Sequence, residues 1–115
     1  MEKTIEIDGK QVKFKSTAAT PLRFKRQFGK DFFAEIYKLE PMQKAMQNKK
    51  LSNAEKLAKV DFELFYNIAW VLAKTADDKI SEPLTWLDGF DVFPIGEIFP
   101  ELNELIVVSM QGKKK

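Results

Sequence analysis

The side chains of this chain that could perform acid–base chemistry are closely spaced pairs of acids. The pairs are Asp61 with Glu63, Asp77 with Asp78, and Asp88 with Asp91. Two carboxylates catalyse hydrolysis only when they converge on a cleft and one is desolvated enough to hold its proton. The second pair is typical of a solvated turn, and the spacing of the third matches no calcium-binding loop. None of the pairs therefore predicts a catalytic or metal site.

The other residue types that carry chemistry are missing or scattered. The chain has no cysteine and no histidine, which excludes disulfides, zinc–thiolate sites, cysteine nucleophiles and histidine general bases. Its five glycines are isolated, so there is no glycine-rich phosphate loop. The sequence predicts a protein that is not an enzyme and that holds no cofactor or metal.

Charge is distributed unevenly along the chain. Residues 1–74 carry 15 basic and 9 acidic side chains, whereas residues 75–112 carry 8 acidic and one basic. Arg23 and Arg26, which lie in a basic run with Phe24 and Phe28, could contact phosphates, but the acidic second half would repel nucleic acid. The asymmetry suggests oriented self-association, head to tail or with a charged partner. The alternative is that two solvated faces simply carry net charges of opposite sign.

An aromatic run in the second half is the other candidate for binding. It consists of Trp86, Phe90, Phe93 and Phe99. Trp and Phe are enriched at protein interfaces, and a small core already filled by the aromatic residues of 62–70 could leave this run exposed. The alternative is that the four residues close the core from its other end.

The elements that must position these residues begin with a β-hairpin. Residues 4–15 alternate apolar and polar on both sides of Asp8-Gly9, which is a strong hairpin signal. A two-residue turn pairs Ile5 with Val12, and a four-residue loop pairs Ile7 with Val12. Because two strands alone are marginally stable, the hairpin needs a helix beneath it or another subunit's strand beside it.

Two helices are expected next. Thr20 is the expected cap of the first, with Pro21 at its first position and Gly29 at its end. Asp31 begins the second, and Pro41 stops it.

The apolar run over residues 62–73 predicts the central core helix. Residues 42–53 before it are lysine-rich and form either a short exposed helix or a mobile connection. Ser52, with Glu55 three residues later, caps a long helix that continues to about Thr75. Its charge-free part is too short to cross a membrane, so we expect it to be wrapped by other elements.

The remaining elements are less regular. Ser81 is the expected cap of a short helix that ends at Gly89, and residues 90–96 are irregular but apolar. A final helix is interrupted or started at Pro100. The whole predicts an α+β, mainly helical single domain over residues 1–112, with about five helices around the central one. The helical part covers residues 20–110, and residues 113–115 form a disordered basic tail.

Three ordered stretches resemble the tail assembly chaperones of bacteriophages with long, non-contractile tails, including prophages of Gram-positive bacteria. They are the basic run ending in Phe-Gly-x-Asp (20–31), the central helix (64–74), and Trp-Leu-Asp-Gly-Phe (86–90) followed by an apolar helix. The resemblance covers nearly the whole chain except residues 42–53.

The resemblance implies a non-enzymatic assembly factor. Such chaperones coat the helical tape measure protein, keep it soluble, help recruit tail tube subunits, and are absent from the finished virion. Self-association is expected of a protein that coats a filament, and the partner-binding candidates are Trp86, Phe90, Phe93, Phe99, Arg23 and Arg26. The N-terminal residues contain no signal-peptide region, so we expect the host cytoplasm.

Many such chaperones also have a longer form made by ribosomal frameshifting. The lysine run 113–115 could be encoded by a slippery site, or it could be a plain charged tail. Two other functions stay open: a small nucleic-acid-binding regulator of phage or prophage origin, and a structural component of the tail.

Overall fold

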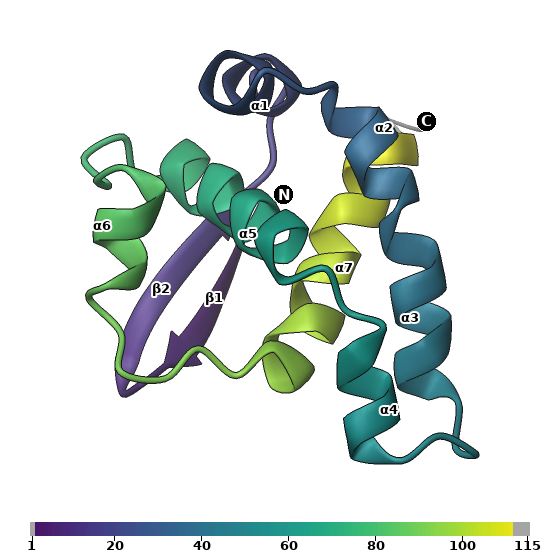
Figure 1. Ribbon diagram of the computed structural model, residues 1–115. Coiled ribbons are helices and arrows are strands. Elements are labelled where there is room, and N and C mark those ends of the chain that lie inside the picture. The colour runs from purple at the N-terminus through teal and green to yellow at the C-terminus, as the bar shows by residue number, and fades with distance from the viewer. Residues whose placement is uncertain (1, 112–115) are drawn as a thin grey trace.

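The computed structural model describes residues 2–111, and the side chains of residues 2–107 (Figure 1). Strands β1 (Glu2–Ile7) and β2 (Lys10–Lys15) form a hairpin, and seven helices follow within the described residues. This confirms the predicted α+β, mainly helical fold class. The predicted basic tail, residues 113–115, lies outside the described residues. The helices are α1 (Thr20–Phe28), α2 (Phe32–Tyr37), α3 (Leu39–Gln47), α4 (Asn53–Ala58), α5 (Phe62–Ala76), α6 (Pro83–Leu87) and α7 (Ile95–Gln111).

The hairpin has the two-residue turn. Ile5 pairs with Val12, and Asp8 and Gly9 have φ angles of 55° and 77°, as a type I′ turn requires. The apolar side of the hairpin lies against α5, which crosses it, and α7 runs beside β1 (Figure 1). Phe14 is fully buried there. The helix that the hairpin needs for stability is therefore α5.

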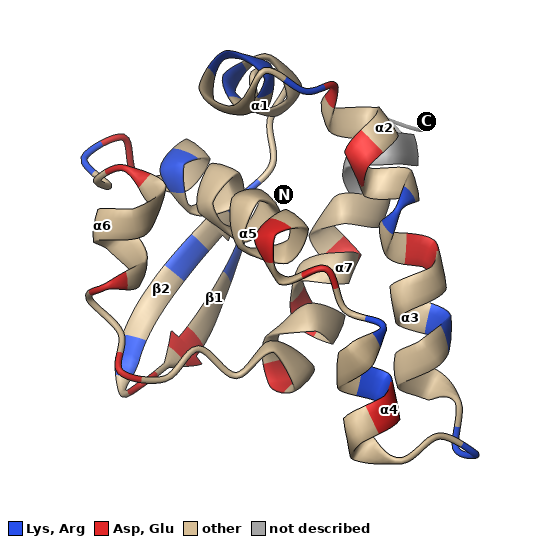
Figure 2. Ribbon diagram, viewed as in Figure 1, with Lys and Arg blue, Asp and Glu red and all other residues tan. Residues whose placement is uncertain are grey.

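Helix α1 ends where expected, but it begins one residue earlier, at Thr20, so Thr20 is not its cap. The Thr20 hydroxyl accepts a 3.0 Å hydrogen bond from the backbone N–H of Thr17 and lies 3.3 Å from the hydroxyl of Thr75. It makes no cap bond because the residue is fully buried against α5. Gly29 ends the helix with a φ of 72°, as predicted. The basic residues of α1 are visible in Figure 2.

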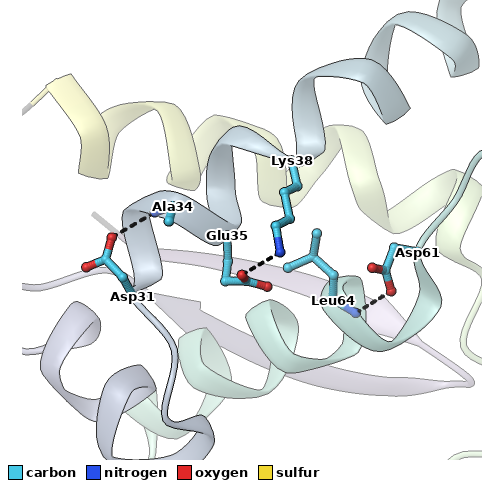
Figure 3. A network of polar contacts seen from close by, with 6 residues as sticks. All are labelled: Asp31, Ala34, Glu35, Lys38, Asp61 and Leu64. Carbon is cyan, nitrogen blue, oxygen red and sulfur yellow. Dashed lines mark hydrogen bonds and ion pairs between the residues drawn. The ribbon is translucent and has the colours of Figure 1, made fainter.

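Helices α2 and α3 replace one predicted helix and the lysine-rich connection. Asp31 caps α2, because its Oδ2 accepts a 2.9 Å hydrogen bond from the N–H of Ala34 (Figure 3). The expectation that Pro41 stops a helix is wrong. Pro41 lies in the first turn of α3, where its missing N–H costs nothing. Of the two alternatives for residues 42–53, a helix is correct through Gln47, although Met42 and Ala45 are buried rather than exposed.

The predicted long helix is two helices. The capping box is present: Ser52 Oγ accepts from the N–H of Glu55 at 3.2 Å, and Glu55 Oε1 accepts from the N–H of Ser52 at 2.7 Å. However, α4 ends at Ala58, and α5 begins at Phe62 with its own cap. Asp61 Oδ1 accepts a 3.1 Å hydrogen bond from the N–H of Leu64 (Figure 3). This second cap ends the continuity that the apolar spacing suggested.

Helix α5 is the centre of the core. More than half of its side chains are buried, including those of Leu64, Ile68 and Leu72. The buried residues of the hairpin, α1, α2, α3, α5 and α7 form one continuous cluster. The prediction of a central, wrapped helix is confirmed for residues 62–76.

The final helix is neither interrupted nor started at Pro100, which were the two alternatives expected from the sequence. Helix α7 begins at Ile95 and runs through Pro100, which cannot donate a hydrogen bond to the carbonyl of Gly96. Buried side chains on both sides of the proline, Phe99 and Leu102, hold the helix against the core. Ser81 does not cap α6, which begins at Pro83 without a side-chain cap bond.

Candidate functional site

One member of each acidic pair makes a structural hydrogen bond. Asp61 caps α5, and Asp77 Oδ1 accepts a 3.0 Å hydrogen bond from the N–H of Lys79. The N–H of Asp91 donates to Asp8 Oδ2 at 2.9 Å and so ties the segment after α6 to the hairpin turn. Within residues 2–107, no three acidic side chains gather in a way that could hold a metal ion.

Glu35 is the one buried carboxylate among the described side chains. Its Oε2 accepts a 2.8 Å hydrogen bond from Nζ of Lys38, the residue that follows α2 (Figure 3). The hydrogen bond and the negative charge of Glu35 raise the pKa of Lys38. The negative charge of Asp61, which caps α5, makes a smaller contribution to the pKa of Lys38 in the same direction. The contact between Glu35 and Lys38 is structural rather than reactive.

Three of the four predicted aromatic residues form one cluster. The ring centroids of Trp86, Phe90 and Phe93 lie 5.4 Å, 5.5 Å and 5.7 Å apart in edge-to-face arrangements. All three are partly exposed and pack against the core. Phe99 is different: it is only 2% exposed and contacts Phe65 at 5.6 Å between centroids. Phe99 is therefore a core residue, as the alternative interpretation of this run expected.

The hairpin holds this aromatic cluster in place. Lys10 Nζ lies 5.2 Å from the centroid of the Phe90 ring and donates a hydrogen bond to the carbonyl oxygen of Gly89. A cation over an aromatic face is attracted by the ring quadrupole, which is negative over the face. Together with the bond between Asp91 and Asp8, these contacts fix residues 89–91 to the turn end of the hairpin.

Trp86 also lines a groove of about 480 Å³, which we call the Trp86 groove. Strand β2 forms one wall, and the end of α5 with the segment leading to α6 forms the other. Its volume is within the range of about 300–1,000 Å³ that is usual for ligand sites. The lining residues are Lys10, Gln11, Val12, Lys13, Ala76, Asp77, Ile80 and Trp86.

The two predicted arginines line a second groove of about 400 Å³ between α1 and α5, the α1 groove. Three cations surround it and no acid lines it: Arg23 donates to the hydroxyl of Thr75 at 3.0 Å, and Lys74 donates to the carbonyl oxygens of Asp78 and Ile80, both at 2.7 Å. Arg26 is exposed and has no ion-pair partner within residues 2–107. The lining residues are Ala19, Leu22, Arg23, Arg26, Gln27, Trp70 and Lys74.

The contribution of α5 to the α1 groove was not predicted from the sequence. Trp70 and Lys74 are four residues apart and share one face of α5, which is a signal the sequence contains. Nothing in the sequence placed that face beside Arg23 and Arg26, because the contact between α1 and α5 joins distant parts of the chain.

No protein-family model, curated protein or solved structure matches this chain. Across residues 2–111, the helices are too short or too polar for any of them to cross a membrane.

Proposed function

We propose that this protein is a non-enzymatic tail assembly chaperone of a bacteriophage with a long, non-contractile tail. It binds the tape measure protein in the host cytoplasm, keeps it soluble, helps recruit the tail tube subunits, and is absent from the finished virion. The proposal rests on the ordered resemblance of residues 20–31, 64–74 and 86–90 to that family.

The Trp86 groove is the surface that we propose binds the tape measure protein. Its apolar wall consists of Val12, Ile80 and Trp86, and charged side chains such as Lys13 and Asp77 stand at its rim. A tape measure segment is an amphipathic helix that aggregates when its apolar stripe is exposed to water. An apolar groove with a charged rim suits the apolar anchors of such a helix.

The experiment is co-expression with the candidate tape measure protein, followed by affinity capture. The gene for this protein is expected between the genes for the major tail protein and the very long tape measure protein, so the neighbouring gene supplies the partner. Trp86→Ala and Lys13→Glu should each reduce capture and increase the insoluble fraction of the tape measure protein. Lys13 is exposed, so its replacement leaves the core intact.

Leu57→Ser is the matched control, because Leu57 is 52% exposed on α4, in neither groove. Capture equal for all variants and the wild type would remove the Trp86 groove from the proposal. No capture of the neighbouring gene product by the wild type would overturn the chaperone function itself.

The α1 groove supports a second candidate, a small nucleic-acid-binding regulator. Arg23, Arg26 and Lys74 could contact backbone phosphates. A gel shift of duplex DNA that weakens with salt and is lost in Arg26→Glu would favour this function. Finding the protein in purified virions would instead favour a structural tail component.

A further inference from the structure

An exposed apolar side chain with acidic neighbours projects from α6. Leu84 is 74% exposed, more than any other large apolar residue described. Asp88 follows it by four residues on the same side of the helix, and Glu82 precedes the helix. Both acids are exposed and have no ion-pair partner within residues 2–107. We call Leu84, Glu82 and Asp88 the α6 knob.

The α1 groove has the complementary character. Its apolar surface includes Leu22, which is 54% exposed, and its charged side chains are all basic. Figure 2 shows the contrast between the basic residues of α1 and the acidic residues around α6. Arg side chains pair with carboxylates through two parallel hydrogen bonds, so Arg23 and Arg26 suit acids such as Glu82 and Asp88.

The two surfaces are held in a fixed relation within one molecule. Trp70 and Lys74, which line the α1 groove, bind the carbonyl oxygens of Asp78, Ile80 and Ser81, directly before α6. Each copy of the chain therefore presents a groove and a knob in a constant arrangement.

We propose that the α6 knob of one copy docks in the α1 groove of a second copy. Leu84 covers the apolar surface beside Leu22, and Asp88 and Glu82 pair with Arg26 and Arg23. Two grooves would repel each other, as would two knobs, so the charges permit only the groove-to-knob contact. This contact uses a surface separate from the Trp86 groove and does not depend on the chaperone function.

The test is analytical ultracentrifugation of the full chain between about 1 and 500 µM. The wild type should associate as its concentration rises and dissociate as salt screens the ion pairs. Leu84→Ser and Arg26→Glu should each weaken association at least about tenfold. Leu57→Ser, which removes an equally accessible leucine elsewhere, should associate like the wild type.

Mixing two defective variants gives the sharper result. Arg26→Glu retains a normal knob and Asp88→Arg retains a normal groove, so each alone should associate more weakly than the wild type, whereas their equimolar mixture should recover association because every contact between unlike variants pairs opposite charges. A wild type that stays monomeric throughout the range, or a mixture that stays monomeric, overturns the proposal. Circular dichroism checks that the variants are folded, and their capture of the tape measure protein reports on the separate Trp86 groove.

Discussion

The indole Nε1 of Trp70 donates a 2.7 Å hydrogen bond to the carbonyl oxygen of Ser81. This bond joins the central helix to the segment that leads into α6. Lys74, one turn later on α5, binds the carbonyl oxygens of Asp78 and Ile80 in the same segment. The position of α6, and with it both grooves, is therefore set by side chains of α5.

Replacing Trp70 by Phe should destabilise the fold by about 0.5–1.5 kcal/mol, because the hydrogen bond to the Ser81 carbonyl is lost while most apolar contacts remain. Urea unfolding measures the change. Trp86→Phe is the control, since the Trp86 indole makes no hydrogen bond within the described residues. This variant should lose less unfolding free energy than Trp70→Phe. Equal losses would mean that the bond adds nothing to stability.

The core face of α5 should be sensitive to truncation. Leu64, Ile68 and Leu72 are nearly or fully buried, so each change to Ala should cost roughly 2–5 kcal/mol of unfolding free energy. Leu57→Ala should cost far less, because Leu57 lies on the separate helix α4 and is half exposed. A comparable loss at Leu57 would support a single continuous helix instead of α4 and α5.

The start of α5 should depend on its cap. Asp61→Ala removes the acceptor for the N–H of Leu64 and should cost about 0.5–2 kcal/mol of stability. Asp61→Asn keeps a side-chain oxygen at the same position and should remain close to the wild type. Thermal unfolding of the three proteins measures the difference, and an equal loss in both variants would point to the charge rather than the cap.

The contact between β1 and α7 should depend on pH in the alkaline range. Lys3 Nζ pairs with Glu101 at 3.0 Å and with Glu104, and these hydrogen bonds raise the pKa of Lys3 above its usual 10.5. A raised lysine pKa stabilises the folded state below pH 10.5, and the contribution disappears as pH rises through the folded-state value.

The stability difference between the wild type and Lys3→Gln should therefore be constant at neutral pH and vanish at high pH. Urea unfolding at a series of pH values measures it. Lys13→Gln, on the same hairpin but without an ion pair among the described residues, should show no such convergence. A wild-type advantage that persists above the Lys3 pKa would contradict the assignment.

Local signals in the sequence predicted the local structure well. Asp8-Gly9, Gly29, Asp31 and the Ser52–Glu55 capping box each act within a few residues, so they could be interpreted without knowing the fold. Two of the failures had non-local causes. Pro100 remains inside α7 because core contacts hold both sides of the helix, and the hydroxyl of Thr20 turns away from a cap to meet Thr75.

Only some residues of each candidate site could be predicted from the sequence. Arg23, Arg26 and Trp86 could be selected for their residue types, but their partners Lys74, Ile80 and Val12 come from other elements. Phe99 could not be separated from Phe90 and Phe93 by type, since only the packing of α7 buries it. Groove shape depends on such tertiary contacts.

The contacts of the hairpin with residues 91, 101 and 104 determine when the packing of the hairpin is completed during synthesis. The hairpin leaves the ribosome first, yet its apolar face stays uncovered until α5 emerges. Lys3 and Asp8 find their partners only after residues 91–104 have been translated. These contacts therefore complete the packing of the hairpin after α5 has covered its apolar face, because contacts of high sequence separation must wait for their second half.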